Sequence, residues 1–199
     1  MNGDEALRIE EDLTVKKLRV QDYREMPWKS GKGTTHQIAI SPEGADFTKE
    51  SFLWRVSTAP MIEDGVFSHF PGYERILMVV QGEGLLLNRR ILSPFETVRF
   101  SGNETMNAKL ISGPILDLGV IHDPEKVKVD LQFIPNLRSE TVFSFSTGTH
   151  FVYCIQGTMR VNGELVGEGE SIRFDESEGF NVTIGFDVSG SGVHVSLTD

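Results

Sequence analysis

The chain has 199 residues, 39% of them hydrophobic and 24% charged, a balance typical of a globular protein that forms one medium domain or two small barrels. Its formal net charge of −10 and the absence of any Lys/Arg block in the sequence exclude general binding to nucleic acid. A single cysteine, Cys154, excludes an intrachain disulfide, and without a signal-peptide pattern or an apolar run of membrane-spanning length we expect a cytoplasmic protein with no membrane contact.

Short apolar or alternating segments recur along the chain, and turn signals separate them. Strands are predicted at residues 12–22, 37–40, 52–58, 75–80, 85–87, 95–101, 115–121 and 151–155, with residues 123–130 as a connection or an edge strand. The apolar stripe of an amphipathic helix is almost absent from the sequence. Short strands at near-regular spacing predict an all-β sandwich or barrel.

A central stretch, residues 52–87, organises the rest of the chain. Residues 75–80 (Arg-Ile-Leu-Met-Val-Val) are too apolar for a strand with one wet face, so we expect this strand to be buried on both sides. Arg55 and Arg75 lie in or beside these apolar strands. A buried guanidinium group needs an anionic or hydrogen-bonding partner, which makes the two arginines candidate functional residues.

The second half of the chain partly repeats the first. Residues 151–161 echo residues 76–86, because each segment is an apolar strand, then Gln-Gly, then another strand. This repeat suggests two similar β-units, at residues 1–122 and 123–199, that exchange strands and form one compact body.

Residues 23–36 are predicted to form a loop, because Pro27 breaks regular structure there. Lys29, Thr35 and His36 supply hydrogen-bond donors within it. The loop superficially resembles a phosphate cradle, but it lacks the spacing G-x-x-x-x-G-K-[ST] and no helix follows.

An anion site is the chemistry that these residues favour. A guanidinium group binds a carboxylate through two parallel hydrogen bonds, and the mouth of a barrel gives the dry surroundings that strengthen them. Alternatively, Arg75 pairs with Glu74 or Asp117 and only holds the neighbouring loop, so that Trp54, Phe67 and Phe70 are simply core residues.

Metal and acid–base chemistry are weaker interpretations. His69 and Glu74 lie near the spacing of a cupin metal site, but Pro71 occupies the position of the second histidine, so no metal or other cofactor is predicted. His69 is better interpreted as a loop residue, and Asp64 and Glu74 as turn and ion-pair residues. There is no G-x-S-x-G motif, and no catalytic residue is assigned.

Several segments together resemble the HutD/Ves family in the same order. They are Met26-Pro-Trp-Lys-Ser-Gly-Lys-Gly-Thr-Thr, Trp54-Arg-Val-Ser-Thr-Ala, Asp64-Gly-Val-Phe-Ser-His-Phe-Pro-Gly-Tyr-Glu-Arg, Gln81-Gly-Glu-Gly, Phe100-Ser-Gly and Gly113-Pro-Ile-Leu-Asp-Leu-Gly-Val. The resemblance implies a bicupin, often dimeric, linked in bacteria to histidine utilisation and stress responses. It also implies a small ligand related to formylglutamate. Ser30 and Gly119 depart from the family pattern, in which Asn is usual.

We therefore expect a small-carboxylate-binding bicupin, a possible homodimer, that regulates or buffers an intermediate of histidine degradation. The predicted ligand-binding residues are Lys29, Thr35, His36, Arg55, His69, Arg75 and Asp117. Two alternatives stay open at this point. One is a metal-dependent cupin isomerase or dioxygenase that uses His69 and Glu74, and the other is a protein whose apolar edge strands serve mainly for assembly.

Overall fold

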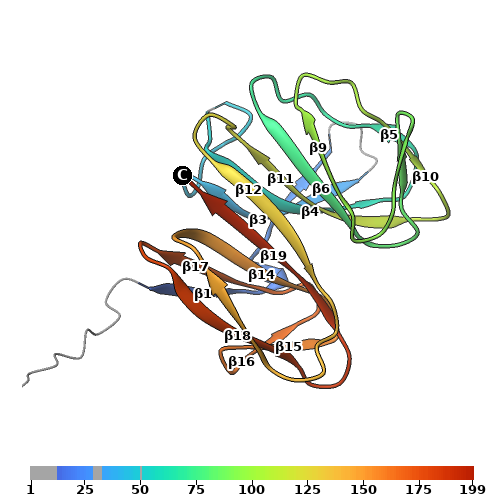
Figure 1. The fold of residues 1–199 in the computed structure, drawn as a ribbon. Coiled ribbons are helices and arrows are strands. Elements are labelled where there is room, and N and C mark those ends of the chain that lie inside the picture. Colours follow the sequence, from blue (N-terminus) through green and yellow to red (C-terminus); the bar gives the residue numbers. More distant parts are fainter. Residues whose placement is uncertain (1–12, 29–32, 50) are drawn as a thin grey trace, which may run out of the picture.

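The computed structural model describes residues 13–28, 33–49 and 51–199, and its fold is all-β with antiparallel sheets. The predicted all-β class and bicupin architecture are confirmed: two β-units lie one above the other (Figure 1). Among the described residues, no helix is long and apolar enough to cross a membrane.

The first β-unit consists of two sheets that together carry every strand from β2 to β11. Its large sheet has the order β2 (Arg24–Pro27), β3 (Thr34–Ser41), β4 (Trp54–Met61), β11 (Ile115–His122), β6 (Glu74–Gln81) and β9 (Thr97–Ser101). Its small sheet has the order β5 (Gly65–Val66), β10 (Asn107–Leu110), β7 (Leu85–Leu87) and β8 (Arg90–Leu92).

The second β-unit contains the strands from β12 onward and also the first strand of the chain. Its large sheet has the order β1 (Thr14–Leu18), β17 (Ser171–Glu176), β14 (Gly148–Gln156), β19 (Ser191–Thr198) and β12 (Lys128–Ile134). Its small sheet has the order β13 (Thr141–Phe145), β18 (Phe180–Phe186), β15 (Thr158–Val161) and β16 (Glu164–Gly167).

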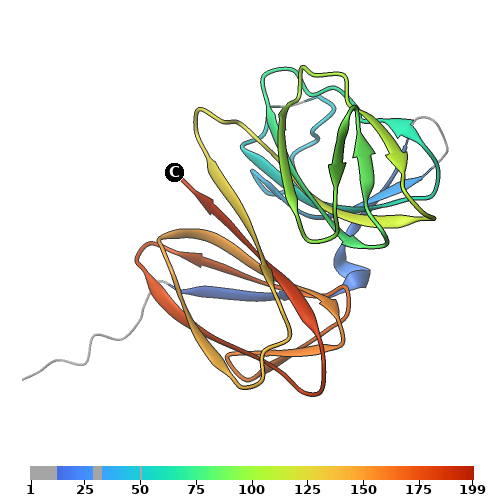
Figure 2. The same cartoon turned by 45° about the vertical axis from the view of Figure 1, so that its right-hand side comes forward.

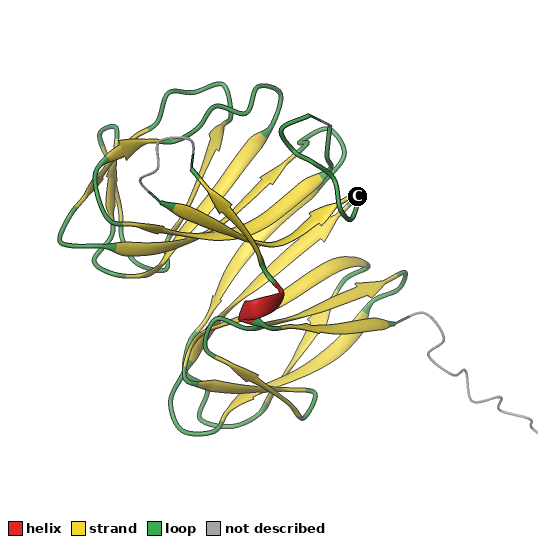
Figure 3. Ribbon diagram, turned by 180° about the vertical axis from the view of Figure 1, so that it is seen from behind, coloured by secondary structure: helices red, strands yellow, loops and turns green. Residues whose placement is uncertain are grey.

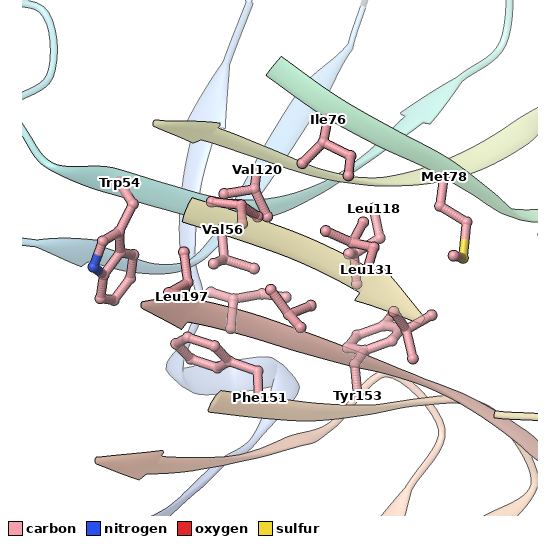
Figure 4. Close-up of a cluster of buried hydrophobic side chains, with 14 of the residues drawn as sticks. Trp54, Val56, Ile76, Met78, Leu118, Val120, Leu131, Phe151, Tyr153 and Leu197 are labelled. Carbon is pink, nitrogen blue, oxygen red and sulfur yellow. The ribbon is translucent and has the colours of Figure 1, made fainter. Parts of the chain in front are cut away.

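The two large sheets pack face to face, and the apolar layer between them is here called the seam. Trp54, Val120 and Leu118 enter it from the first unit, and Phe151 and Tyr153 enter it from the second (Figure 4). Trp54 and Phe151 meet edge to face, with their ring centroids 5.8 Å apart. Aromatic pairs in this geometry stabilise a core beyond the area that they bury.

Strand β6 is buried on both faces, as its apolar composition predicts. Alternate residues of a strand point to opposite faces of its sheet. Ile76 and Met78 therefore pack in the seam, whereas Leu77 and Val79 pack in the core enclosed by the two sheets of the first unit. The echoed strand β14 repeats this arrangement in the second unit.

The amino-terminal segment connects the two units. Strand β1 pairs with β17 of the second unit, and the 3-10 helix Val20–Asp22 then leads to β2 in the first unit (Figures 2 and 3). Tyr23 follows this helix and is buried in the seam. Its hydroxyl group donates to Gly169 O at 2.8 Å and lies 3.1 Å from Ser171 Oγ.

Tyr23→Phe is expected to lower the free energy of unfolding by about 1–2 kcal/mol, because Gly169 and Ser171 lose a buried partner. Urea denaturation measures this loss. Tyr153→Phe is the matched control, because Tyr153 is also buried in the seam but its hydroxyl group makes no hydrogen bond with the described residues. An equal loss in both variants would contradict the importance of the Tyr23 hydrogen bonds.

The structure differs from the sequence prediction near the amino terminus. Residues 23–36 were expected to lie in a loop, but residues 24–27 form β2, with Pro27 as its last residue, and residues 34–36 already belong to β3. Proline is compatible with β2 because this strand lies at the edge of its sheet. The predicted strand 12–22 ends at Leu18 and is followed by the 3-10 helix.

Candidate functional site

Arg55 and Arg75 lie on the two strands that flank β11. Each pairs in register with Ile121, so one strand separates the two arginines and their Cα atoms are about 10 Å apart, twice the spacing of neighbouring strands. Their chain neighbours Trp54 and Ile76 point into the seam. Strand alternation therefore directs both guanidinium groups to the opposite face, toward the interior of the first unit.

Arg55 is buried, at 5% exposure, and is held by neutral groups. Its Nε donates to Gln37 Oε1 at 2.9 Å, its Nη2 lies 3.3 Å from Met26 Sδ, and its guanidinium carbon lies 4.4 Å from the centre of the Phe47 ring. Burial, with repulsion from Arg75, lowers the pKa of Arg55 to about 10. The side chain stays charged at neutral pH.

Arg75 is enclosed by aromatic rings. Its guanidinium carbon lies 4.7 Å from the Phe67 centroid, 5.2 Å from that of Phe100 and 5.7 Å from that of Phe70. Its Nη1 donates to Ser68 O at 3.1 Å. Burial lowers the pKa of Arg75 to about 10, although Asp117 acts in the opposite direction. Phe67 and Phe70 therefore do more than fill the core, because they form the surroundings of a cation.

Asp117 supplies the carboxyl group of this cluster. It lies on β11, two strand positions from Gly119, and is 6% exposed. Burial raises the pKa of Asp117 to about 7, against the attraction of Arg75. The carboxyl group makes no hydrogen bond or ion pair with any described residue. The alternative of an Arg75–Asp117 ion pair is therefore not seen, although the two charges influence each other.

Glu74 also does not pair with Arg75, because it faces the other side of β6. Its Oε1 lies 3.1 Å from Arg99 Nη1 and 3.2 Å from His122 Nε2. Arg99 also donates to Val129 O in the second unit. Glu74 thus belongs to a polar network that connects the two units.

Two further predicted residues, Thr35 and His36, lie on strand β3. Thr35 and Gln37 share one face of β3, and Thr35 Oγ1 accepts a hydrogen bond from Trp28 Nε1 at 2.9 Å. His36 lies between them, so strand alternation directs it to the opposite face. Lys29 lies outside the described residues.

His69 and Glu74 do not come together as the metal-enzyme alternative requires. His69 is exposed, and its Nε2 lies 3.2 Å from Thr105 Oγ1, whereas Glu74 belongs to the network with Arg99 and His122. Asp64, the other carboxylate considered, accepts a hydrogen bond from the backbone of Leu110. Within the described ranges no group of three or more His, Cys, Asp or Glu side chains could hold a metal ion.

At the position equivalent to Arg75, the second unit has a histidine in place of an arginine. Aligning residues 151–161 with 76–86 makes His150 the counterpart of Arg75. His150 Nδ1 lies 2.9 Å from His194 Nε2, and His194 stacks on Phe145 with the ring centroids 3.9 Å apart. Burial lowers the pKa of His194 to about 4. This contact between two imidazoles is partly buried, whereas the first unit carries two guanidinium groups in its interior.

Two cavities are present, and Gln37, the hydrogen-bond partner of Arg55, lines the smaller one. A cavity of about 140 Å³ is bordered by Lys16, Arg24 and Arg173, and one of about 450 Å³ by Trp54 and Asp175. Neither is lined by Arg55, Arg75 or Asp117. Positive charge without an ion-pair partner among the described residues marks the arginine cluster as the candidate site, because a desolvated charge without a partner is unfavourable.

Sequence reasoning missed the residues that hold Arg55. Gln37, Met26 and Phe47 are distant from it in the sequence, and the register of β3 against β4 brings Gln37 to it. A register shift in this pairing between Gln37 and Ala39 cannot be read from a single sequence.

Comparison with known proteins agrees with the fold and with the motifs. The HutD family profile matches residues 20–189. A 21.2 kDa protein from the hutC 3′ region of Pseudomonas putida is 38% identical over 151 residues, which cover 70% of this chain and 77% of that protein.

Solved structures of related proteins have the same fold. HutD from Pseudomonas fluorescens SBW25, in a formate condition, is 29% identical and superposes with a TM-score of 0.78 over 94% of this chain and all of that one. The protein PA5104 from Pseudomonas aeruginosa PAO1 is 25% identical, with a TM-score of 0.82 over the same shares. The nickel-bound pirin YhhW from Escherichia coli, at 10% identity and a TM-score of 0.65 over 92% of this chain and 98% of that one, shares the fold alone. The chain therefore belongs to the HutD family, which is linked to histidine utilisation.

Proposed function

We propose that this protein binds a small carboxylate in the first unit, at Arg55 and Arg75, and that it regulates or buffers an acidic intermediate of histidine degradation such as formylglutamate. The observation that carries the proposal is the presence of two guanidinium groups on one side of the sheet, Arg55 buried and Arg75 half-buried, neither of which forms an ion pair in the part of the chain that the structure describes. A ligand carboxylate supplies the missing negative charge.

The chemistry of the cluster favours an acid with two polar ends. Each guanidinium group can bind a carboxylate through two parallel hydrogen bonds. The two arginines are separated by one strand, so we expect a dicarboxylate to be able to reach both. Formylglutamate carries two carboxylates and fits this requirement.

Aromatic rings complete the proposed site. Phe67 and Phe70 lie against Arg75, and Phe47 lies against Arg55. These rings and Arg75 are partly exposed, so the ligand is expected to enter from the side of the rings. The surrounding apolar groups then exclude water and strengthen the charged hydrogen bonds.

Calorimetric titration with formylglutamate, urocanate, glutamate and formate tests the proposal. We expect saturable binding at one site per chain, with formylglutamate tighter than formate because it can use both arginines. An amide analogue that lacks both negative charges is the control and should not bind. If none of the acids binds, the proposed function is wrong.

A further inference from the structure

Asp117 is a carboxyl group that is almost entirely buried in the interior of the first unit. It is 6% exposed, and it makes no hydrogen bond or ion pair with the residues that the structure describes. An ionised carboxylate in such a place is strongly disfavoured, whereas the neutral acid is tolerated. The proton on Asp117 is therefore sensitive to any charge that enters the cluster.

The charged groups that act on this interior come from three strands, because Arg24 on β2 also repels Arg55. Arg75 on β6 and Arg55 on β4 point into it, and Arg75 is the charge that acts on Asp117. The remaining strands that enclose this core contribute apolar side chains, namely Leu85, Leu87, Leu92, Val98, Phe100 and Ala108. No second acidic side chain in the described core competes for the arginines.

We propose that Asp117 takes up one proton when the carboxylate ligand binds, so that it enters the complex as a neutral acid that donates its O–H to a ligand oxygen. This inference rests on the proposed function of the arginine pair. As a hydrogen-bond donor, Asp117 selects a ligand that has an acceptor oxygen at this position over one that has a donor group. The uptake of the proton makes the affinity depend on pH.

Electrostatics explains the direction of the coupling. In the free protein Arg75 favours the ionised form of Asp117, and burial favours the neutral form, so that the pKa is about 7. A ligand carboxylate neutralises Arg75 and adds a like charge beside Asp117. Both effects raise the pKa of Asp117 further, and the proton then comes from the solvent.

Above about pH 7 the affinity for the ligand is expected to fall as pH rises, by up to about tenfold for each pH unit, because binding requires Asp117 to take up a proton. Calorimetry with formylglutamate in two buffers of different ionisation enthalpy counts the protons. At about pH 8 we expect close to one proton taken up per ligand, and at about pH 5 close to none, because Asp117 is then already neutral.

Asp117→Asn should show no proton uptake at about pH 8 and an affinity nearly independent of pH. Asp64→Asn is the matched control, because Asp64 is an exposed carboxylate that accepts a backbone hydrogen bond, and its proton uptake should equal that of the wild type. If Asp117→Asn does not fold, infrared difference spectra of the wild type decide, since a protonated carboxyl band should grow when ligand is added at about pH 8.

The possible failures are distinguishable. If the wild type binds no acid at any pH, the proposed function is wrong and this inference falls with it. If the wild type binds formylglutamate without proton uptake and without the infrared band, the ligand site stands and the role of Asp117 is overturned.

Discussion

Arg75→Met is expected to weaken formylglutamate binding by about 2–5 kcal/mol, the usual loss when one partner of a desolvated charge pair is truncated. The methionine keeps an unbranched apolar side chain against Phe67, Phe70 and Phe100, so the packing is nearly conserved. The guanidinium group that is proposed to bind the ligand carboxylate is lost. Calorimetric titration at about pH 6 measures the change.

The fold should tolerate this substitution at about pH 6. Asp117 is mainly neutral there, because burial raises its pKa to about 7, so the loss of Arg75 does not leave an isolated charge. Urea denaturation should show a change in unfolding free energy of less than about 1.5 kcal/mol. A large loss of stability with unchanged affinity in the folded protein would mean that Arg75 is structural.

Arg173→Met is the matched control for removing a partly buried arginine from aromatic surroundings. Its guanidinium carbon lies 5.4 Å from the Trp54 ring centroid, and its Nε lies 2.8 Å from Asp175 Oδ2 in the second unit. Because Arg173 already has a carboxylate partner, its removal should leave affinity unchanged. Equal loss of affinity in both variants would indicate a general effect on the fold.

The sequence predicted the architecture well because strand composition reports burial directly. The run Ile76 to Val80 lies between two cores, and every residue in it packs against one of them. The echo of this run at residue 151 marks the equivalent strand of the second unit. The hydrophobic pattern of a segment and its flanking turn residues indicate a buried strand even when its partner strands are unknown.

The site was predicted only in part, because contacts between distant strands depend on register. Arg55, Arg75 and Asp117 face the same interior because β4, β11 and β6 are neighbours in one sheet. The partner of Arg55, Gln37, depends on a register shift, and the separation of Arg75 from Glu74 depends on the face that each occupies. Neither is fixed by spacing along the chain.

Asp117→Asn is expected to stabilise the protein at alkaline pH by about 3–5 kcal/mol and to have little effect near pH 4. Burial raises the pKa of Asp117 from 3.8 to about 7. Between these values the folded protein keeps a proton that the unfolded chain has lost, so the wild type loses stability as pH rises. A shift of about three pH units at about 1.4 kcal/mol each gives the expected size.

The asparagine is uncharged at every pH, so the variant does not lose stability through the ionisation of position 117. The other titratable groups of the protein are unchanged. Below about pH 4 both forms of position 117 are neutral, and the two proteins should unfold alike. Above about pH 7 Asp117 is ionised in the folded and unfolded states of the wild type, and the full difference is present. Urea denaturation of both proteins at about pH 4.5, 6 and 8 follows the difference, with Asp64→Asn as the exposed control. A difference that is the same at all three pH values would show that Asp117 does not carry a raised pKa, because only a group that titrates between the folded and unfolded states can make the stability gap grow with pH.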